Sequence, residues 1–296
     1  MGQYWRLVCL DKRQATGSYG KLGEFIFDGS SPRYIARMLT RGIYYIPDRP
    51  LSARPISEHT TNVGSVIESL PDIVLDTIML HLPVVDVWCF ALTCYRTLEI
   101  GRRNLARYFN FKEGNRVWAG CRIICVGDYI EDYPPGVLTA SEEAELSEKN
   151  LFRLADDFGE DCSYEDPMSS FCERVLFSGH YGLARELLPK YKIMSQQDKS
   201  YILRNLTTKE YVRAEAFHDT LAKFNIGDLI LSRICWSSDD SVAMVNNVDI
   251  HRGLWAGHRL DVSTKDTVDD TWKDATDKSY EWVKSIYENE FGKINS

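Results

Sequence analysis

The order of apolar and polar positions along the chain predicts a mixed fold with more helix than strand. Short apolar and aromatic runs are typical of strands, and they occupy residues 4–10, 22–27, 123–126, 232–236 and 260–262. Longer stretches with apolar residues at helical spacing predict helices, and these cover residues 32–40, 65–109, 142–158, 169–178, 183–191, 191–231 and 272–291. We therefore expect a helix-rich α+β fold whose strands are short.

A segment rich in proline divides the chain. Residues 46–64 contain several Pro, Ser and Thr residues, which is typical of an irregular loop. We expect three regions, namely a strand-and-loop segment over 1–64, a helical segment over 65–112 and a mixed α/β region over 113–296. Because the apolar side chains near the N-terminus need a core, we expect residues 1–45 to form one domain with the mixed region.

Helix signals are clearest over residues 65–109. A Leu-Pro pair is followed by Asp72, which is a pattern that begins helices. Pro83 ends this first helix, and Asp86 is placed to cap a second helix that starts at Val87. Together the apolar residues of these helices form one broad face.

This helical segment resembles an F-box. The resemblance is carried by residues 70–82 (LPDIVLDTIMLHL), by Asp86 and by residues 91–96 (ALTCYR). F-boxes are three short helices whose apolar surface docks on a Skp-type linker protein. The resemblance implies an adaptor that recruits a substrate protein to a cullin–RING ubiquitin ligase. The residues that it places at the linker contact are Leu70, Pro71, Ile78, Leu82, Val87 and Leu92.

The residues before this segment carry a second resemblance. Residues 1–5 (MGQYW), 10–13 (LDKR) and 21–25 (KLGEF) are similar to the opening of a large set of proteins from mushroom-forming (basidiomycete) fungi. Many of those proteins carry an F-box-like segment in the same place. The resemblance covers most of the chain and implies no particular activity.

A short motif, Trp-Ala-Gly-x-Arg, occurs twice. The first copy spans residues 118–122 and the second spans residues 255–259, and each leads into a strand-like run. Two equivalent strand starts in one mixed domain would explain the repeat. The Trp face, the small Gly and the anion-binding Arg also suggest a ligand cleft, which would be lined by Trp118, Arg122, Trp255 and Arg259. The alternative places both Trp side chains in the core and pairs the arginines with Asp128 or Asp261.

Charge is concentrated in one segment. The chain of 296 residues has a formal net charge of −8, and residues 131–166 alone carry 12 acidic and 2 basic side chains. Such a segment is a solvated surface or a docking face for a basic partner. Because phosphate binding needs clustered Lys and Arg, we expect no nucleic-acid partner.

No cofactor, metal or membrane site is predicted. The 8 cysteines have no CxxC spacing and sit mostly in apolar runs, so we expect buried thiols in a reducing compartment. The sequence has no signal peptide and no apolar run of membrane-spanning length, which favours the cytoplasm or nucleus. Motifs of hydrolases, zinc proteases and kinases are missing, so no catalytic residue is assigned.

Two functional hypotheses remain. In the first, the chain is an adaptor, and the apolar face of residues 70–92 is exposed for a linker protein. In the second, the chain is a single compact α+β domain that acts as an enzyme or small-ligand binder through the Trp-Ala-Gly cleft. The second hypothesis predicts that residues 1–45 or 113–130 cover the same apolar face.

Overall fold

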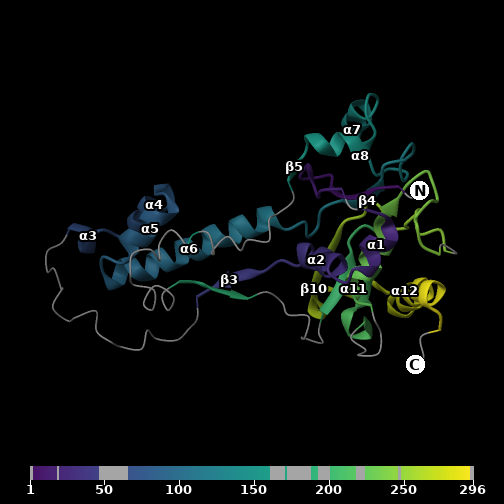
Figure 1. The fold of residues 1–296 in the computed structure, drawn as a ribbon. Helices are drawn as coiled ribbons and strands as arrows, with labels where there is room; N and C mark the ends of the chain where they lie inside the picture. The colour runs from purple at the N-terminus through teal and green to yellow at the C-terminus, as the bar shows by residue number, and fades with distance from the viewer. Residues whose placement is uncertain are drawn as a thin grey trace. The chain divides into compact units, whose positions relative to one another are not determined.

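The chain folds as a helix-rich α+β protein in two compact units (Figure 1). The computed structural model describes residues 3–18, 20–46, 66–160, 171, 188–192, 201–217, 224–245 and 248–293. What we call the mixed unit comprises residues 1–41, 117–163 and 194–296. The helical unit comprises residues 42–116 and 164–193. The N-terminal strand region therefore belongs with the C-terminal mixed region.

A five-stranded sheet runs through the mixed unit. Its strands, in spatial order, are β5 (Gly159–Glu160), β2 (Gln14–Ala15), β1 (Trp5–Cys9), β4 (Ile123–Gly127) and β9 (Cys235–Trp236). Strands β1 and β4 are antiparallel, with Trp5 opposite Gly127 and Cys9 opposite Ile123. The strand at the N-terminus thus pairs with the first strand that follows the helical unit in the sequence.

Both faces of the two central strands are covered. Every residue of β1 and β4 is buried. Leu7 and Cys125 pack into one hydrophobic cluster, whereas Val8 and Ile124 pack into a second cluster. Coverage on both sides explains why these strands read as continuous apolar runs rather than as alternating sequence.

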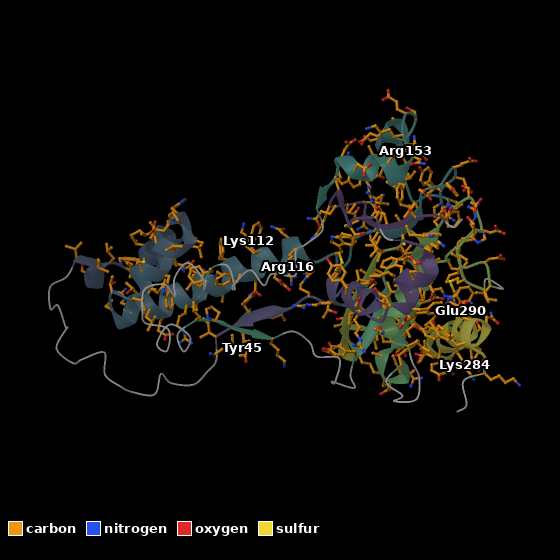
Figure 2. All side chains as sticks on the ribbon, viewed as in Figure 1. Tyr45, Lys112, Arg116, Arg153, Lys284 and Glu290 are labelled. Carbon is orange, nitrogen blue, oxygen red and sulfur yellow. The ribbon has the colours of Figure 1, made fainter. Side chains whose placement is uncertain are left out.

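In the described part of the chain, four helices contribute buried residues to the first cluster, together with strands and loops. The helices are α1 (Leu22–Phe27), α2 (Ser31–Met38), α11 (Ile226–Ile234) and α12 (Thr276–Phe291). Near the end of α12, Glu290 accepts a hydrogen bond of 2.8 Å from the backbone N–H of Val245 (Figure 2). The predicted helices at 32–40 and 272–291 correspond to α2 and α12.

A second sheet completes the mixed unit. Its strands, in order, are β10 (Leu260–Thr264), β7 (Tyr201–Asn205), β8 (Glu210–Arg213) and β11 (Lys273–Asp274). An ion pair of 2.7 Å joins Arg204 of β7 to Asp261 of β10. The prediction of a helix over 191–231 is wrong for the β7–β8 hairpin, where pairing with β10 outweighs the local helical spacing.

Two predicted strands are instead helical. Residues 22–27 form α1, because Leu22, Phe25 and Ile26 fall on one buried helical face and Glu24 accepts from the backbone N–H of Lys21. Most of the strand expected over 232–236 lies in α11, and only β9 remains. Every residue of α11 is buried, so its sequence lacks the polar stripe that marks a surface helix.

The acidic stretch folds into short pieces. The helix expected over 142–158 is divided into α7 (Ala140–Glu145), α8 (Leu151–Leu154) and a 3₁₀ turn, η2 (Ala155–Asp157). Thr139 and Asn150 begin the two helices, because their side-chain oxygens accept backbone N–H groups of the first turn.

The helical unit is built on one long helix. Its elements are α3 (Val66–Ser69), α4 (Asp72–His81), α5 (Val84–Ala91), α6 (Tyr95–Arg116), β3 (Ile43–Tyr45) and β6 (Lys190–Lys192). Gly101 of α6 lies so close to α5 that a Cβ there would meet the Cβ of Ala91 at 2.4 Å. The core includes Leu75, Met79 and Trp88. None of the helices in the described part of the chain is long and apolar enough to cross a membrane.

Two details differ from the sequence prediction. Helix α5 begins at Val84 behind Pro83, so Asp86 lies in the first turn and does not cap a helix at Val87. Residues 190–192 form β6, which pairs antiparallel with β3, where helix was expected to continue to 191. The loop expected over 46–64 and the helix expected over 169–178 lie almost entirely outside the described residues, as does the part of the helix expected over 183–191 that precedes residue 188.

A buried carboxyl group links α11 to α12. Asp228 accepts 2.6 and 2.8 Å hydrogen bonds from the backbone N–H of Asn225 and the hydroxyl of Tyr287. Burial raises the pKa of Asp228 to about 6, although these hydrogen bonds oppose the change. Folded Asp228 therefore binds its proton more tightly than the unfolded chain does, and this contribution to stability is lost as the pH rises from about 4 to 6.

We predict that Asp228→Asn removes this pH dependence. The asparagine keeps a side-chain oxygen that can accept the backbone N–H of Asn225. The free energy of unfolding of the variant relative to wild type should rise by about 1–3 kcal/mol between pH 4 and 7. Urea unfolding at several pH values measures this difference. Asp277→Asn, at an exposed position of α12, is the control. A difference that stays flat across the range would contradict the assignment.

Candidate functional site

The two Trp-Ala-Gly motifs lie against each other. Arg122 and Arg259 form an antiparallel bridge. The backbone N–H of Gly120 donates to the carbonyl of Leu260 at 2.8 Å, and that of Gly257 donates to the carbonyl of Ile123 at 2.7 Å. Each motif thus begins one strand and caps the start of the other, as the repeat in the sequence predicts.

Each motif is a tight turn that depends on its glycine. Gly120 and Gly257 have φ angles of 79° and 77°, in the left-handed region that favours glycine. The backbone N–H of Cys121 donates to Trp118 and that of His258 donates to Trp255, at 3.0 and 2.9 Å. The turns therefore place an arginine immediately before the first residue of each strand, β4 and β10.

The two tryptophans of the motifs pack in the core. Trp118 and Trp255 are both buried in the first hydrophobic cluster. The indole N–H of Trp118 donates to Gln14 Oε1 at 2.8 Å, which satisfies its buried polar atom. These rings act as packing residues, as the alternative to the ligand cleft proposed.

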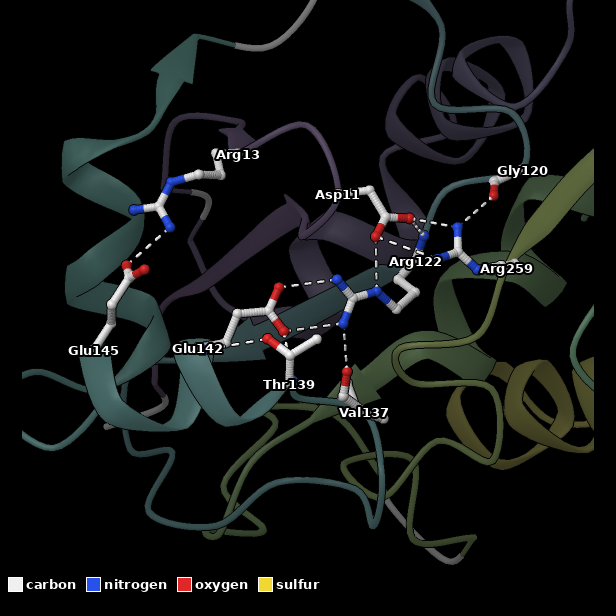
Figure 3. Close-up of polar contacts among 9 residues, drawn as sticks. All are labelled: Asp11, Arg13, Gly120, Arg122, Val137, Thr139, Glu142, Glu145 and Arg259. Atoms are coloured by element: carbon white, nitrogen blue, oxygen red, sulfur yellow. Dashed lines mark hydrogen bonds and ion pairs between the residues drawn. The ribbon is translucent and has the colours of Figure 1, made fainter.

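The arginines are paired, but with other partners than expected (Figure 3). Asp11 lies between them, with Oδ1 2.8 Å from Arg122 Nε and Oδ2 2.6 Å from Arg259 Nη1. Arg122 also contacts Glu142 at 2.9 Å. The expected partners are engaged elsewhere, because Asp128 accepts from the backbone of Tyr4 and Asp261 pairs with Arg204. The prediction of these partners was wrong.

Both carboxyl groups of this cluster favour the ionised form. Burial opposes ionisation of Asp11 and Glu142, but the hydrogen bonds donated by Arg122 outweigh it, and the pKa of both carboxyls is lowered. Two carboxylates and two guanidinium groups cancel in charge. The predicted cleft residues Arg122 and Arg259 therefore hold the fold together and leave no net charge for an anionic ligand here.

The same pattern accounts for the acidic stretch. Its carboxylates pair with arginines from distant parts of the mixed unit, at 2.7 to 2.8 Å, in the pairs Arg6–Asp156, Arg13–Glu145 and Arg252–Asp132. Arg122 also donates to the carbonyl of Val137 at 2.7 Å and so fixes the start of the stretch. Among the described residues of the stretch, Asp132, Glu142, Glu145 and Asp156 thus pair with arginines from outside it.

One arginine that the sequence did not single out lies beside the second motif. Arg233 of α11 is 5% exposed, and its guanidinium carbon lies 4.0 Å from the ring centre of Trp282 and 6.0 Å from that of Trp255. Burial lowers the pKa of Arg233 to about 10. No motif marks it, because its neighbours come from residues far along the chain.

The predicted linker contacts in the helical unit divide into two groups. Pro71, Ile78 and Leu92 are exposed. Leu70 and Leu82 are half-buried and pack against the core, whereas Val87 lies inside it. Val87 therefore cannot be a surface contact, because α5 turns it toward the long helix α6.

The outer face of α4 carries apolar residues that the sequence analysis did not assign. Ile73 and Leu80 are 71% and 62% exposed, and Val74 is exposed as well. Leu75 and Met79 point the other way, into the core. Helix α4 is therefore apolar on both sides, although only its inner side is covered.

Ion pairs fix which side of α4 faces outward. Arg96 of α6 contacts Asp72 at 2.6 Å, and Arg107 of α6 contacts Asp76 at 3.1 Å. The side chain of Asn104 also donates to Asp76 at 2.9 Å. Because the carboxylates flank the inner apolar residues, these contacts hold that side of α4 against α6.

Comparison with known proteins adds no further constraint. No protein-family model, no curated protein and no solved structure matches the chain. Within the described ranges, no group of three or more His, Cys, Asp or Glu side chains could hold a metal ion. The candidate sites are therefore the outer face of α4 and the surroundings of Arg233.

We predict that the two motif glycines differ in their tolerance of a side chain. Gly120→Ala should cost about 1–2 kcal/mol of stability from its left-handed backbone alone, since a Cβ there would meet only Leu206 at 3.8 Å. At Gly257 a Cβ would meet Val137 at 2.3 Å, which should add about 1–3 kcal/mol. Denaturant unfolding of both variants tests this order, and equal losses would contradict the packing described for Val137.

Proposed function

We propose that the chain is an adaptor whose helical unit binds a Skp-type linker protein and whose mixed unit binds a substrate protein. The observation that carries this proposal is the uncovered apolar outer face of α4. The resemblance of residues 66–109 to an F-box supplies the class of partner, and recruitment of the substrate to a cullin–RING ubiquitin ligase follows from that class.

Exposure of an apolar helix face to water is unfavourable in free energy. Each exposed side chain such as Ile73 or Leu80 leaves about 1.5–3 kcal/mol of burial free energy unused. Helices that are apolar on both sides are normally buried on both sides. A partner that covers the outer face of α4 would recover this free energy, which is how helix-in-groove complexes form.

The face is also held ready for a partner. The Asp72–Arg96 and Asp76–Arg107 pairs, with the packing of Leu75, set the rotation of α4 about its own axis. These ion pairs and the packing of Leu75 therefore keep the outer face in a fixed orientation before binding. A pre-organised surface loses less conformational entropy when it binds.

The described structure changes the expected contact set. Pro71, Ile78 and Leu92 remain as contact residues, because they are exposed. We add Ile73 and Leu80 to the proposed contact residues. We remove Val87, because it is buried. Leu70 and Leu82 stay as half-buried residues that support the face from below.

The rival function, an enzyme or small-ligand binder at the Trp-Ala-Gly motifs, has less support. It needs accessible indole rings and an unpaired arginine, whereas Trp118 and Trp255 are buried and the arginines pair with Asp11 and Glu142.

We predict that Ile73→Asp combined with Leu80→Asp weakens binding to a purified Skp-type linker by at least about tenfold, because charges would replace the apolar anchors. Isothermal titration calorimetry of the full-length chain with the linker measures the affinity. The free energy of unfolding of the variant should stay within about 0.5 kcal/mol of wild type, since both positions are on the surface.

A matched control is available in the mixed unit. Leu254 is 63% exposed there, so Leu254→Asp makes the same chemical change away from α4 and should leave linker binding unchanged. The adaptor proposal is overturned if wild type does not bind the linker. It is also overturned if the α4 variant binds as well as the control variant does.

A further inference from the structure

Arg233 is a buried cation without a counter-ion in the described part of the chain. The other buried arginines have partners, because Arg6 contacts Asp156 at 2.7 Å and Arg102 contacts Glu99 at 3.4 Å. No ion pair joins Arg233 to any described carboxylate, and its Nε has no hydrogen-bond partner. An unpaired buried guanidinium is costly for the fold.

Two other arginines that lie over tryptophan rings do have ion-pair partners. Arg204 lies 5.7 Å from the ring centre of Trp272, and Arg252 lies 4.7 Å from that of Trp236. Both also form close ion pairs, with Asp261 and Asp132 respectively. Arg233 makes the closest of these ring contacts, yet it forms no ion pair with a described carboxylate.

The two indole rings restrict where a partner can approach. A guanidinium group is planar and its N–H groups point outward in that plane. Trp282 covers a face of the group, and its own N–H donates to Ser232 Oγ at 3.1 Å, which holds the ring in place. The open positions are therefore along the edge, and half-buried Trp282 forms a wall that reaches the surface.

We propose that Arg233 and Trp282 form a binding site for a carboxylate attached to an apolar or aromatic group. The edge of a guanidinium matches the two oxygens of a carboxylate, and the half-buried indole ring of Trp282 would contact the apolar part of the ligand. This site is independent of the linker-binding face on α4.

Local charge favours a monoanion over a phosphate dianion. The charge of Glu210 of β8 acts on Arg233 and opposes the effect of burial on its pKa, although the two groups form no ion pair. One unpaired cation can neutralise one negative charge, and Glu210 would repel a second. The carboxylate could belong to a small organic acid or to the C-terminus of a peptide.

The test uses the full-length chain with benzoate and with benzamide, which has a similar shape but no charge. We expect saturating benzoate to raise the thermal unfolding midpoint by about 2–4 °C and to change tryptophan fluorescence, with no effect of benzamide. Equal effects of the two compounds would overturn the proposal. So would binding of inorganic phosphate as tight as that of benzoate.

Variants locate the site. Arg233→Gln should weaken benzoate binding at least tenfold, whereas Arg252→Gln, which alters an arginine already paired with Asp132, should not weaken it. If Arg233→Gln does not fold, Trp282→Leu takes its place and should also lose tenfold or more. Wild-type affinity in either site variant would overturn the assignment.

A second pair of probes identifies the source of the carboxylate. A short peptide ending in a free phenylalanine carboxylate is compared with the same peptide carrying a C-terminal amide. Tighter binding of the free peptide than of benzoate supports a chain terminus as the ligand, and tighter binding of benzoate supports a small acid. If neither the free peptide nor benzoate binds, the proposed site is wrong.

Discussion

The ion pairs of Asp11 with Arg122 and Arg259 are the interaction on which the mixed unit depends. Asp11 lies 111 positions before Arg122 and 248 before Arg259 in the sequence. It therefore ties the N-terminal hairpin to both Trp-Ala-Gly turns at the point where two strands begin. Loop closure over such distances costs entropy, and the partly exposed, oriented ion pairs together with the β1–β4 ladder help to offset that cost.

The same use of charge appears elsewhere in the chain. In the mixed unit, arginines such as Arg6 and Arg252 bind the acidic stretch that gives the protein its negative charge. In the helical unit, Arg96 and Arg107 bind the carboxylates of α4. Surface ion pairs contribute little stability one by one. Their effect here is to specify orientation, since each fixes which side of an element faces its neighbour.

The sequence predicts features that depend on residues close together in the chain better than features that depend on distant residues. The start of α4 and the break between α4 and α5 are predicted from Asp72 and Pro83, and the repeat predicts that each Trp-Ala-Gly motif leads into a strand. That the two motifs pair with each other is visible only in the structure. The β7–β8 hairpin was missed because strand β10, its partner, lies more than fifty residues away along the chain. Arg233 was missed for the same reason, since its ring contacts come from Trp255 and Trp282. Neither the register of a sheet nor the absence of a counter-ion can be predicted from residues that are close in the sequence.

Each unit leaves one kind of interaction incomplete. In the mixed unit, apolar surface is largely covered and arginines are mostly paired, but Arg233 keeps an unmatched charge. In the helical unit, the charges beside the core are paired, but the outer apolar face of α4 is uncovered. A folded chain tolerates such costs when a ligand or partner relieves them. Because one feature is ionic and the other apolar, the two proposed sites depend on different physical interactions, and a substitution at one should leave binding at the other unchanged.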